Sequence, residues 1–167
     1  MTRSNYITAE GERRLRDELR FLWKVERVEV TQRVSDAAKE GDRSENAEYI
    51  YSKKRLREID RRIRYLTLRL ENIQRITQLP TNRGKIYFGA WVTIKNKQGE
   101  QHCYRIVGTD EFDAKVNYIS IDAPMARALV GKSVGEIIKL KLEGGTQYWT
   151  IEAIEYRIDD ITLSNHL

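Results

Sequence analysis

Apolar side chains recur every three or four residues through the first half of the chain, which is the spacing of one face of an α-helix. A polar patch at Glu26 and Glu29 interrupts the first stripe once. The pattern predicts a helix over 9–38, with Thr8 as its N-cap and Gly41 ending it. The stripe consists of Leu15, Leu19, Leu22, Val30, Val34 and Ala37.

A second stripe has the alternating three- and four-residue spacing of a coiled-coil seam. It predicts a helix over 45–77, capped by Ser44 and followed by Pro80. Each helix would be about 45–50 Å long at 1.5 Å per residue, so the two should fold back as an antiparallel hairpin. One continuous helix is the alternative, but it would have to include Gly41 and the polar cluster 42–44. The stripe consists of Leu56, Ile59, Ile63, Leu66, Leu70 and Ile73.

From Pro80 onward the apolar positions alternate, which predicts short β-strands. Gly144-Gly145 reads as a hairpin turn, a phase slip near Ile154 indicates a β-bulge, and 124–130 fits one short helix. The predicted fold class is therefore α+β: a coiled-coil hairpin domain over 1–79 with its tip at about 40–46, then a small antiparallel sheet domain over 80–158. Residues 80–84 are the expected junction, and 159–167 are expected to form a tail.

The composition excludes several classes of protein. The chain has 167 residues and one cysteine, so it can form neither an intramolecular disulfide nor a cysteine-based zinc finger. It contains no apolar run of the roughly 18 residues that a membrane span needs and no secretory signal, so we expect a cytoplasmic protein without a membrane partner. His102, Cys103 and His166 show no ligand spacing and are interpreted as structural or incidental.

Positive charge is concentrated in the second helix. Segment 53–69 holds eight basic and two acidic residues, an excess larger than the net charge of +5 of the whole chain. Heptad positions place one group of cations on the face away from the seam: Lys54, Arg57, Arg61 and Arg64. Arg55, Arg62 and Arg69 fall on its flank. A solvated helix face is one interpretation, but the single sign and the excess of arginine favour an anionic partner, most simply nucleic acid phosphates read without base specificity.

The predicted tip carries two acids, Asp42 and Glu45. One interpretation is structural, because Gly41 ends a helix, Ser44 caps the next one and Glu45 favours its N-terminus. The other is functional, because carboxylates at the end of a long arm are well placed for delivery to another molecule. Two carboxylates cannot complete a magnesium site, so any metal at the tip would need ligands from a partner.

Several segments resemble the bacterial Gre transcript-cleavage factors. They are 41–49 (GDRSENAEY) and 53–62 (KKRLREIDRR) in the hairpin, and 88–92 (FGAWV), 105–108 (RIVG) and 122–129 (DAPMARAL) in the second domain. The resemblance covers about residues 5–157. It implies an FKBP-like second domain that docks at the rim of the secondary channel of RNA polymerase, and a hairpin that enters the channel. The chain would then act as a monomeric, non-enzymatic cofactor that stimulates the polymerase to cleave backtracked nascent RNA.

The resemblance also implies roles for individual residues. Asp42 and Glu45 match the tip acids, and we expect them to retain a Mg²⁺ ion shared with the polymerase, with none in the isolated protein. A basic face would lie near the RNA 3′ end, and it consists of Lys53, Lys54, Arg57, Arg61 and Arg64. The loop Asp122-Ala123-Pro124 matches a polymerase-contacting loop, although family members often have serine where Ala123 stands. Direct contact with DNA is left open.

Three other functions compete with this one. A non-cleaving regulator would occupy the same channel and would need the arm but not the acids. A prolyl isomerase or chaperone would follow from the FKBP-like fold, but fold does not carry activity. A general RNA-binding coiled coil would bind RNA without polymerase and would not need Asp42.

Overall fold

The structure is a computed structural model that describes residues 3–41 and 45–157. The chain divides into two compact units, one formed by Glu12–Asn72 and the other by Met1–Gly11 together with Ile73–Leu167. The predicted domain boundary at residues 79 and 80 stays a prediction; in the structure, residues 1–11 and 73–79 group with the sheet unit. No helix in the described part of the chain is long and apolar enough to cross a membrane.

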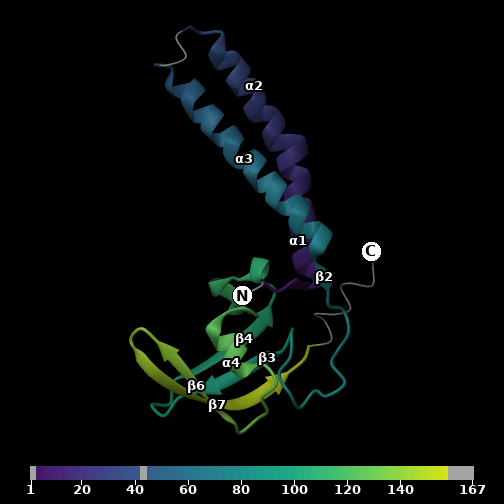
Figure 1. Cartoon of the computed structure of the whole chain (residues 1–167), viewed down its shortest axis with the longest axis vertical. Helices are drawn as coiled ribbons and strands as arrows, with labels where there is room; N and C mark the ends of the chain where they lie inside the picture. Colours follow the sequence, from purple (N-terminus) through teal and green to yellow (C-terminus); the bar gives the residue numbers. More distant parts are fainter. Residues whose placement is uncertain (1–2, 42–44, 158–167) are drawn as a thin grey trace. The chain divides into compact units, whose positions relative to one another are not determined.

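The first unit is the helical hairpin, drawn in purple through blue to teal in Figure 1. Its first arm consists of α1 (Ala9–Phe21), the π-helical turn η1 (Leu22–Glu26) and α2 (Arg27–Ala38); its second arm is α3 (Ala47–Asn72). The predicted hairpin is thus confirmed, and the one continuous helix is excluded. The buried apolar side chains all lie along the predicted seam: Leu15, Leu22, Val30, Ala37, Ile59 and Leu66.

The π-helical turn explains the interruption in the first stripe. Leu15 and Leu22 are seven residues apart, as are Val30 and Ala37, but Leu22 and Val30 are eight apart. Two heptads separated by one extra residue cannot both face the seam in a regular α-helix. The wider turn over residues 22–26 absorbs the extra residue, so that Leu22 and Val30 are both buried.

The ends of α1 and α3 differ in how well the sequence predicted them. Thr8 caps α1 as expected, because its hydroxyl accepts a hydrogen bond of 3.1 Å from the Gly11 N–H. The prediction that the second helix continues to residue 77 is wrong, since α3 ends at Asn72. There the chain turns into a parallel pairing of β1 (Tyr6–Ile7) with β2 (Gln74–Arg75), which uses the backbone groups that a longer helix would need.

The second unit contains a five-stranded sheet with the strand order β5-β4-β3-β7-β6. Figure 1 labels four of these strands, β3, β4, β6 and β7. The strands are β3 (Trp91–Lys95), β4 (Gln101–Val107), β5 (Tyr118–Ser120), β6 (Ile137–Leu142) and β7 (Gly145–Glu155). All neighbours are antiparallel except β4 and β5, which the sequence analysis expected to be antiparallel. The predicted bulge is present on β7, at Glu152, because Ile151 pairs with Ile94 and Ala153 with Thr93.

The core of this unit lies between one face of the sheet and the short helix α4 (Pro124–Leu129). Alternate residues of the strands point into it, including Val92, Ile94 and Ile106, and α4 contributes Ala126 and Leu129. The predicted fold class, a helical hairpin followed by a small mostly antiparallel sheet with one short helix, is therefore confirmed. Short 3₁₀ turns, η2 (Thr109–Glu111) and η3 (Ala114–Val116), connect β4 to β5.

Candidate functional site

The turn between the two arms lies at one end of the hairpin unit. Gly41 has a φ of +124°, a conformation that favours glycine, so the first arm ends as the sequence predicted. The predicted cap Ser44 lies outside the described residues, and the cap that the structure shows is Asn46. Its side-chain oxygen accepts from the Tyr49 N–H (3.1 Å), and its amide donates to the Ala37 carbonyl (2.8 Å). Asn46 therefore joins the two arms across the turn as well as starting α3.

Of the two predicted acids, the structure describes only Glu45, and Asp42 lies outside the described residues. The Glu45 side chain is exposed beside the start of α3. A carboxylate oxygen is a ligand type that Mg²⁺ accepts, but the described residues contain no group of three or more metal-ligating side chains. The Mg²⁺ ion shared with the polymerase therefore stays a prediction.

The predicted basic face consists of exposed side chains along α3. Among the described residues, none of its five members forms an ion pair with another side chain, and Lys53 lies over the Tyr49 ring at 5.9 Å. This face is therefore a row of cations whose charge the hairpin itself does not neutralise. Its members are Lys53, Lys54, Arg57, Arg61 and Arg64.

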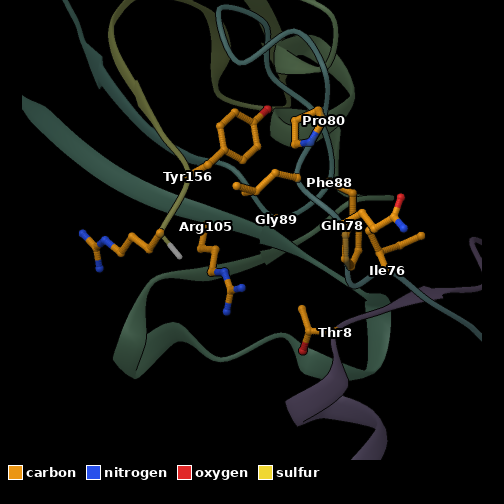
Figure 2. A pocket seen from close by; sticks show the side chains of 10 residues that line it. Thr8, Ile76, Gln78, Pro80, Phe88, Gly89, Arg105 and Tyr156 are labelled. Carbon is orange, nitrogen blue, oxygen red and sulfur yellow. The ribbon is translucent and has the colours of Figure 1, made fainter. Parts of the chain in front are cut away.

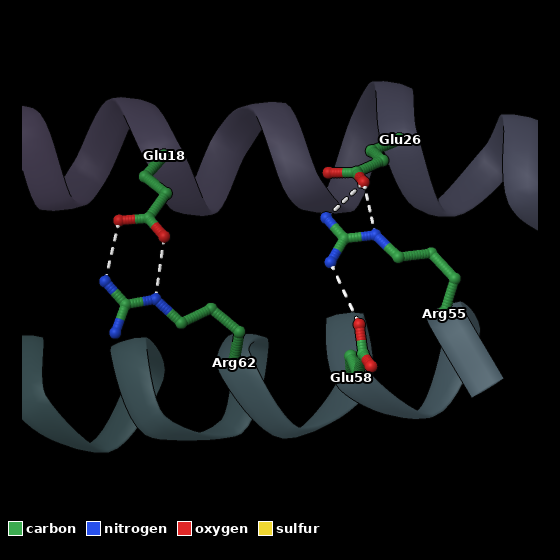
Figure 3. A network of polar contacts seen from close by, with 5 residues as sticks. All are labelled: Glu18, Glu26, Arg55, Glu58 and Arg62. Carbon is green, nitrogen blue, oxygen red and sulfur yellow. Dashed lines mark hydrogen bonds and ion pairs between the residues drawn. The ribbon is translucent and has the colours of Figure 1, made fainter.

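Two of the three arginines predicted on the flank of the seam, Arg55 and Arg62, behave differently, because they bridge the arms (Figure 3). Arg62 makes two hydrogen bonds to the Glu18 carboxylate, of 2.7 and 2.9 Å. Arg55 pairs with Glu26 on the opposite arm and with Glu58 on its own helix, at 2.8 and 3.3 Å. The hydrogen bond with Glu26 raises the pKa of Arg55 above its usual value. In this arrangement both guanidinium groups are paired within the hairpin, unlike the cations of the basic face.

The predicted docking loop, Asp122-Ala123-Pro124, leads into α4, where Pro124 occupies the first turn. The Asp122 carboxylate accepts hydrogen bonds from the Ser4 N–H and the Thr109 hydroxyl, both 2.8 Å, and lies 4.0 Å from Arg127. Burial alone would raise the pKa of Asp122, but these hydrogen bonds and nearby arginines lower it. Asp122 therefore fastens the N-terminal segment to the sheet unit, whatever else it contacts.

A second acid that the sequence analysis did not single out supports the same segment. Glu111 is buried, and its carboxylate accepts from the backbone of Thr8 (3.1 Å) and Gly108 (2.8 Å) and from the Thr8 hydroxyl. Gly11 packs so closely on Glu111 that a β-carbon there would clash with the carboxylate. The only signal in the sequence was the Thr8 cap, and it does not reveal a partner more than a hundred residues away.

The sheet unit also has a small pocket, shown in Figure 2. Thr8, Pro80, Phe88, Arg105 and Tyr156 are among its lining residues, and its volume is about 30 Å³. That volume suits one or two water molecules rather than an organic substrate. The Tyr156 hydroxyl donates to the Lys85 carbonyl (2.6 Å) and accepts from the Tyr87 N–H (2.9 Å). These two hydrogen bonds to the backbone fix the Tyr156 side chain in the wall of the pocket. Burial raises the pKa of Tyr156, which keeps its proton in place.

These features define a class of protein: a helical arm with acid at its turn and unneutralised cations along one face, joined to a small sheet unit. Two protein-family models match most of this chain. The transcription elongation factor N-terminal model matches residues 5–74, and the transcription elongation factor GreA/GreB C-terminal model matches 80–156. The chain belongs to the GreA/GreB family of transcription elongation factors.

Curated relatives agree along nearly the whole length. The chain is 58% identical to transcription elongation factor GreB of Pasteurella multocida over 156 residues, covering 93% of this chain and 99% of the relative. It is 55% identical to GreB of Pseudomonas aeruginosa over 150 residues, covering 90% and 89%. Among solved structures, the GreA factor homolog Gfh1 of Thermus thermophilus matches with 24% identity and a TM-score of 0.41, covering 92% of this chain and 99% of that one.

Proposed function

We propose that this protein binds bacterial RNA polymerase through the secondary channel and stimulates the polymerase to cleave backtracked nascent RNA. The observation that carries the proposal is the separation of charge on the hairpin. An exposed carboxylate stands at the turn, and exposed cations follow along α3, without ion pairs to the side chains that the structure describes. Membership of the GreA/GreB family and 58% identity to a GreB supply the polymerase as the partner.

The chain's own residues divide the work in this proposal. Arg57, Arg61 and Arg64 attract the phosphates of displaced RNA, because none of them forms an ion pair with a described side chain. The apolar seam holds the two arms together and Arg55 and Arg62 link them on one flank, so that the turn is presented by a stiff rod rather than by a loose loop.

Asp42 and Glu45 act at the end of that rod. They would help to hold a Mg²⁺ ion jointly with the polymerase, and the ion would supply stabilisation of the entering and leaving oxygens in phosphodiester hydrolysis. The carboxylates themselves orient an attacking water by accepting its hydrogen bonds. Asn46 helps to fix the position of the neighbouring Glu45, because its two hydrogen bonds join the start of α3 to the end of α2.

The test is a cleavage assay on a reconstituted backtracked complex with 3′-labelled RNA. We expect the wild-type chain to release short 3′ fragments faster than the polymerase alone, and to leave free RNA intact when the polymerase is omitted. Binding without any faster cleavage would overturn the proposal in favour of a non-cleaving regulator of the channel. Cutting of free RNA would show that the chain has a nuclease site of its own.

A further inference from the structure

The hairpin carries an open groove that plays no part in the proposed cleavage. The groove runs between the first arm, at α1 and η1, and α3, on the flank of the seam away from Arg55 and Arg62, and has a volume of about 540 Å³. Its apolar side chains are Leu19, Trp23, Ile63 and Leu70. A volume of this size accommodates several side chains of a partner, within the range of natural binding pockets.

Trp23 is the most unusual member of this groove. Trp23 is 56% exposed, which is unusual for so large an apolar residue. Tryptophan is also one of the residue types enriched in binding hot spots. Trp23 lies within the π-helical turn η1, whose extra residue is needed to keep Leu22 and Val30 in the seam. Turns of this kind occur frequently at functional sites. One guanidinium, that of Arg27, covers a face of the indole at 5.5 Å.

The charged residues of the groove are all cations. Arg16, Arg20 and Lys24 line it, and none of the described residues that line it is acidic. Arg16 pairs with Glu12 on its own helix at 2.7 Å. The pair of Arg20 with Asp17, at 3.4 Å, is exposed on both sides, so it contributes little and exchanges readily. Arg64 lies one turn before Thr67, a lining residue, on the same side of α3.

We propose that this groove receives an acidic amphipathic helix of the polymerase, as a third helix packed along the hairpin. The inference rests on the proposed function only for the identity of the partner. An apolar furrow between two antiparallel helices is the surface that a third helix covers in a bundle, with its apolar stripe inserted between them. The three cations of the rim select a helix whose flanking positions are acidic.

Two other occupants fit the groove less well. A second copy of the chain would place the same patch against itself, so the three cations would face three cations. Single-stranded RNA would need aromatic rings on which successive bases stack. Trp23 is the one aromatic residue that lines the groove, its ring already carries Arg27, and the remaining apolar lining is aliphatic.

The experiment measures the affinity of the full chain for a backtracked polymerase complex. Trp23→Ala should raise the dissociation constant about tenfold, as truncation of a hot-spot residue does. The matched control is Phe21→Ala, because Phe21 is 52% exposed on the same arm but lines a different groove, with Glu26 and Arg55. Lys24→Glu should weaken binding at least threefold. Because it changes only an exposed side chain, it tests the groove even if Trp23→Ala fails to fold.

A photo-crosslinker at Thr67 identifies what lies in the groove. We expect attachment to a polymerase helix with acidic flanks, while the same crosslinker at Arg33, in the other groove, should not reach that helix. Unchanged affinity in both groove variants, an equal loss in Phe21→Ala, or attachment from Thr67 to RNA would overturn the inference. These results differ from failure of the proposed function, in which the wild-type chain itself does not bind or does not raise cleavage. At saturating concentration, Trp23→Ala should still reach the wild-type cleavage rate.

Discussion

The stability of the hairpin should depend strongly on Leu66 and only weakly on Leu68, which lies two residues further along the same helix. Leu66 is 0% exposed in the seam, whereas Leu68, on the same helix, is 56% exposed. Replacing Leu66 by alanine removes buried carbon atoms worth about 2 kcal/mol of transfer free energy, and the cavity left behind adds about 1–2 kcal/mol. Leu66→Ala should therefore lower the free energy of unfolding by about 3–4 kcal/mol, and Leu68→Ala by less than about 1 kcal/mol.

The assay is urea denaturation followed by circular dichroism at 222 nm, which the helices dominate. Hydrogen exchange of peptides within 47–72 then assigns the loss to α3 rather than to the sheet unit. The effect should be large because the described hairpin has a single row of buried apolar side chains and no second layer to compensate. If the two variants lose the same stability within about 1 kcal/mol, the hairpin is not held by this seam.

Three further predictions follow from single contacts. Arg57→Ala should lower the salt slope of binding to single-stranded RNA by about 0.7, while Arg62→Ala, already paired with Glu18, should leave it nearly unchanged in a fluorescence titration. The pKa of Asp122 is lowered in the folded protein, so its ionised form stabilises the fold. The difference in free energy of unfolding between wild type and Asp122→Asn should therefore be constant near neutral pH and shrink as the pH falls through that pKa, as measured by thermal denaturation at a series of acidic pH values. Gly11→Ala should reduce the melting temperature because of the clash with the buried acid it packs on, whereas Gly144→Ala, with open space around it, should not.

The sequence predicted the hairpin well because its seam depends on local periodicity. Six apolar residues at alternating spacings of three and four leave few other arrangements for α3, and Gly41 marks the turn. The same periodicity could not reveal η1, because the eight-residue interval from Leu22 to Val30 looks like a polar interruption until both residues are seen buried.

The features that the sequence did not predict depend on distant partners. The helix that should have reached residue 77 ends at Asn72, because β2 bonds to a two-residue strand near the N-terminus. Ile73 keeps the heptad spacing but takes no part in a helix. Similarly, nothing local to Asp122 shows that its carboxylate accepts from the Ser4 backbone, 118 residues away. Periodicity reports which face is buried, and not which far segment covers a polar group.

The most direct test of the proposed function separates binding from cleavage at the turn. Asp42→Asn and Glu45→Gln should each bind the backtracked polymerase complex with nearly wild-type affinity yet lose most of the stimulated cleavage at saturating concentration. Glu40→Gln, a neighbouring exposed acid outside the matched pair, is the control and should keep full cleavage. If Asp42→Asn and Glu45→Gln cleave as fast as Glu40→Gln when fully bound, the carboxylates at the turn do not act in the reaction.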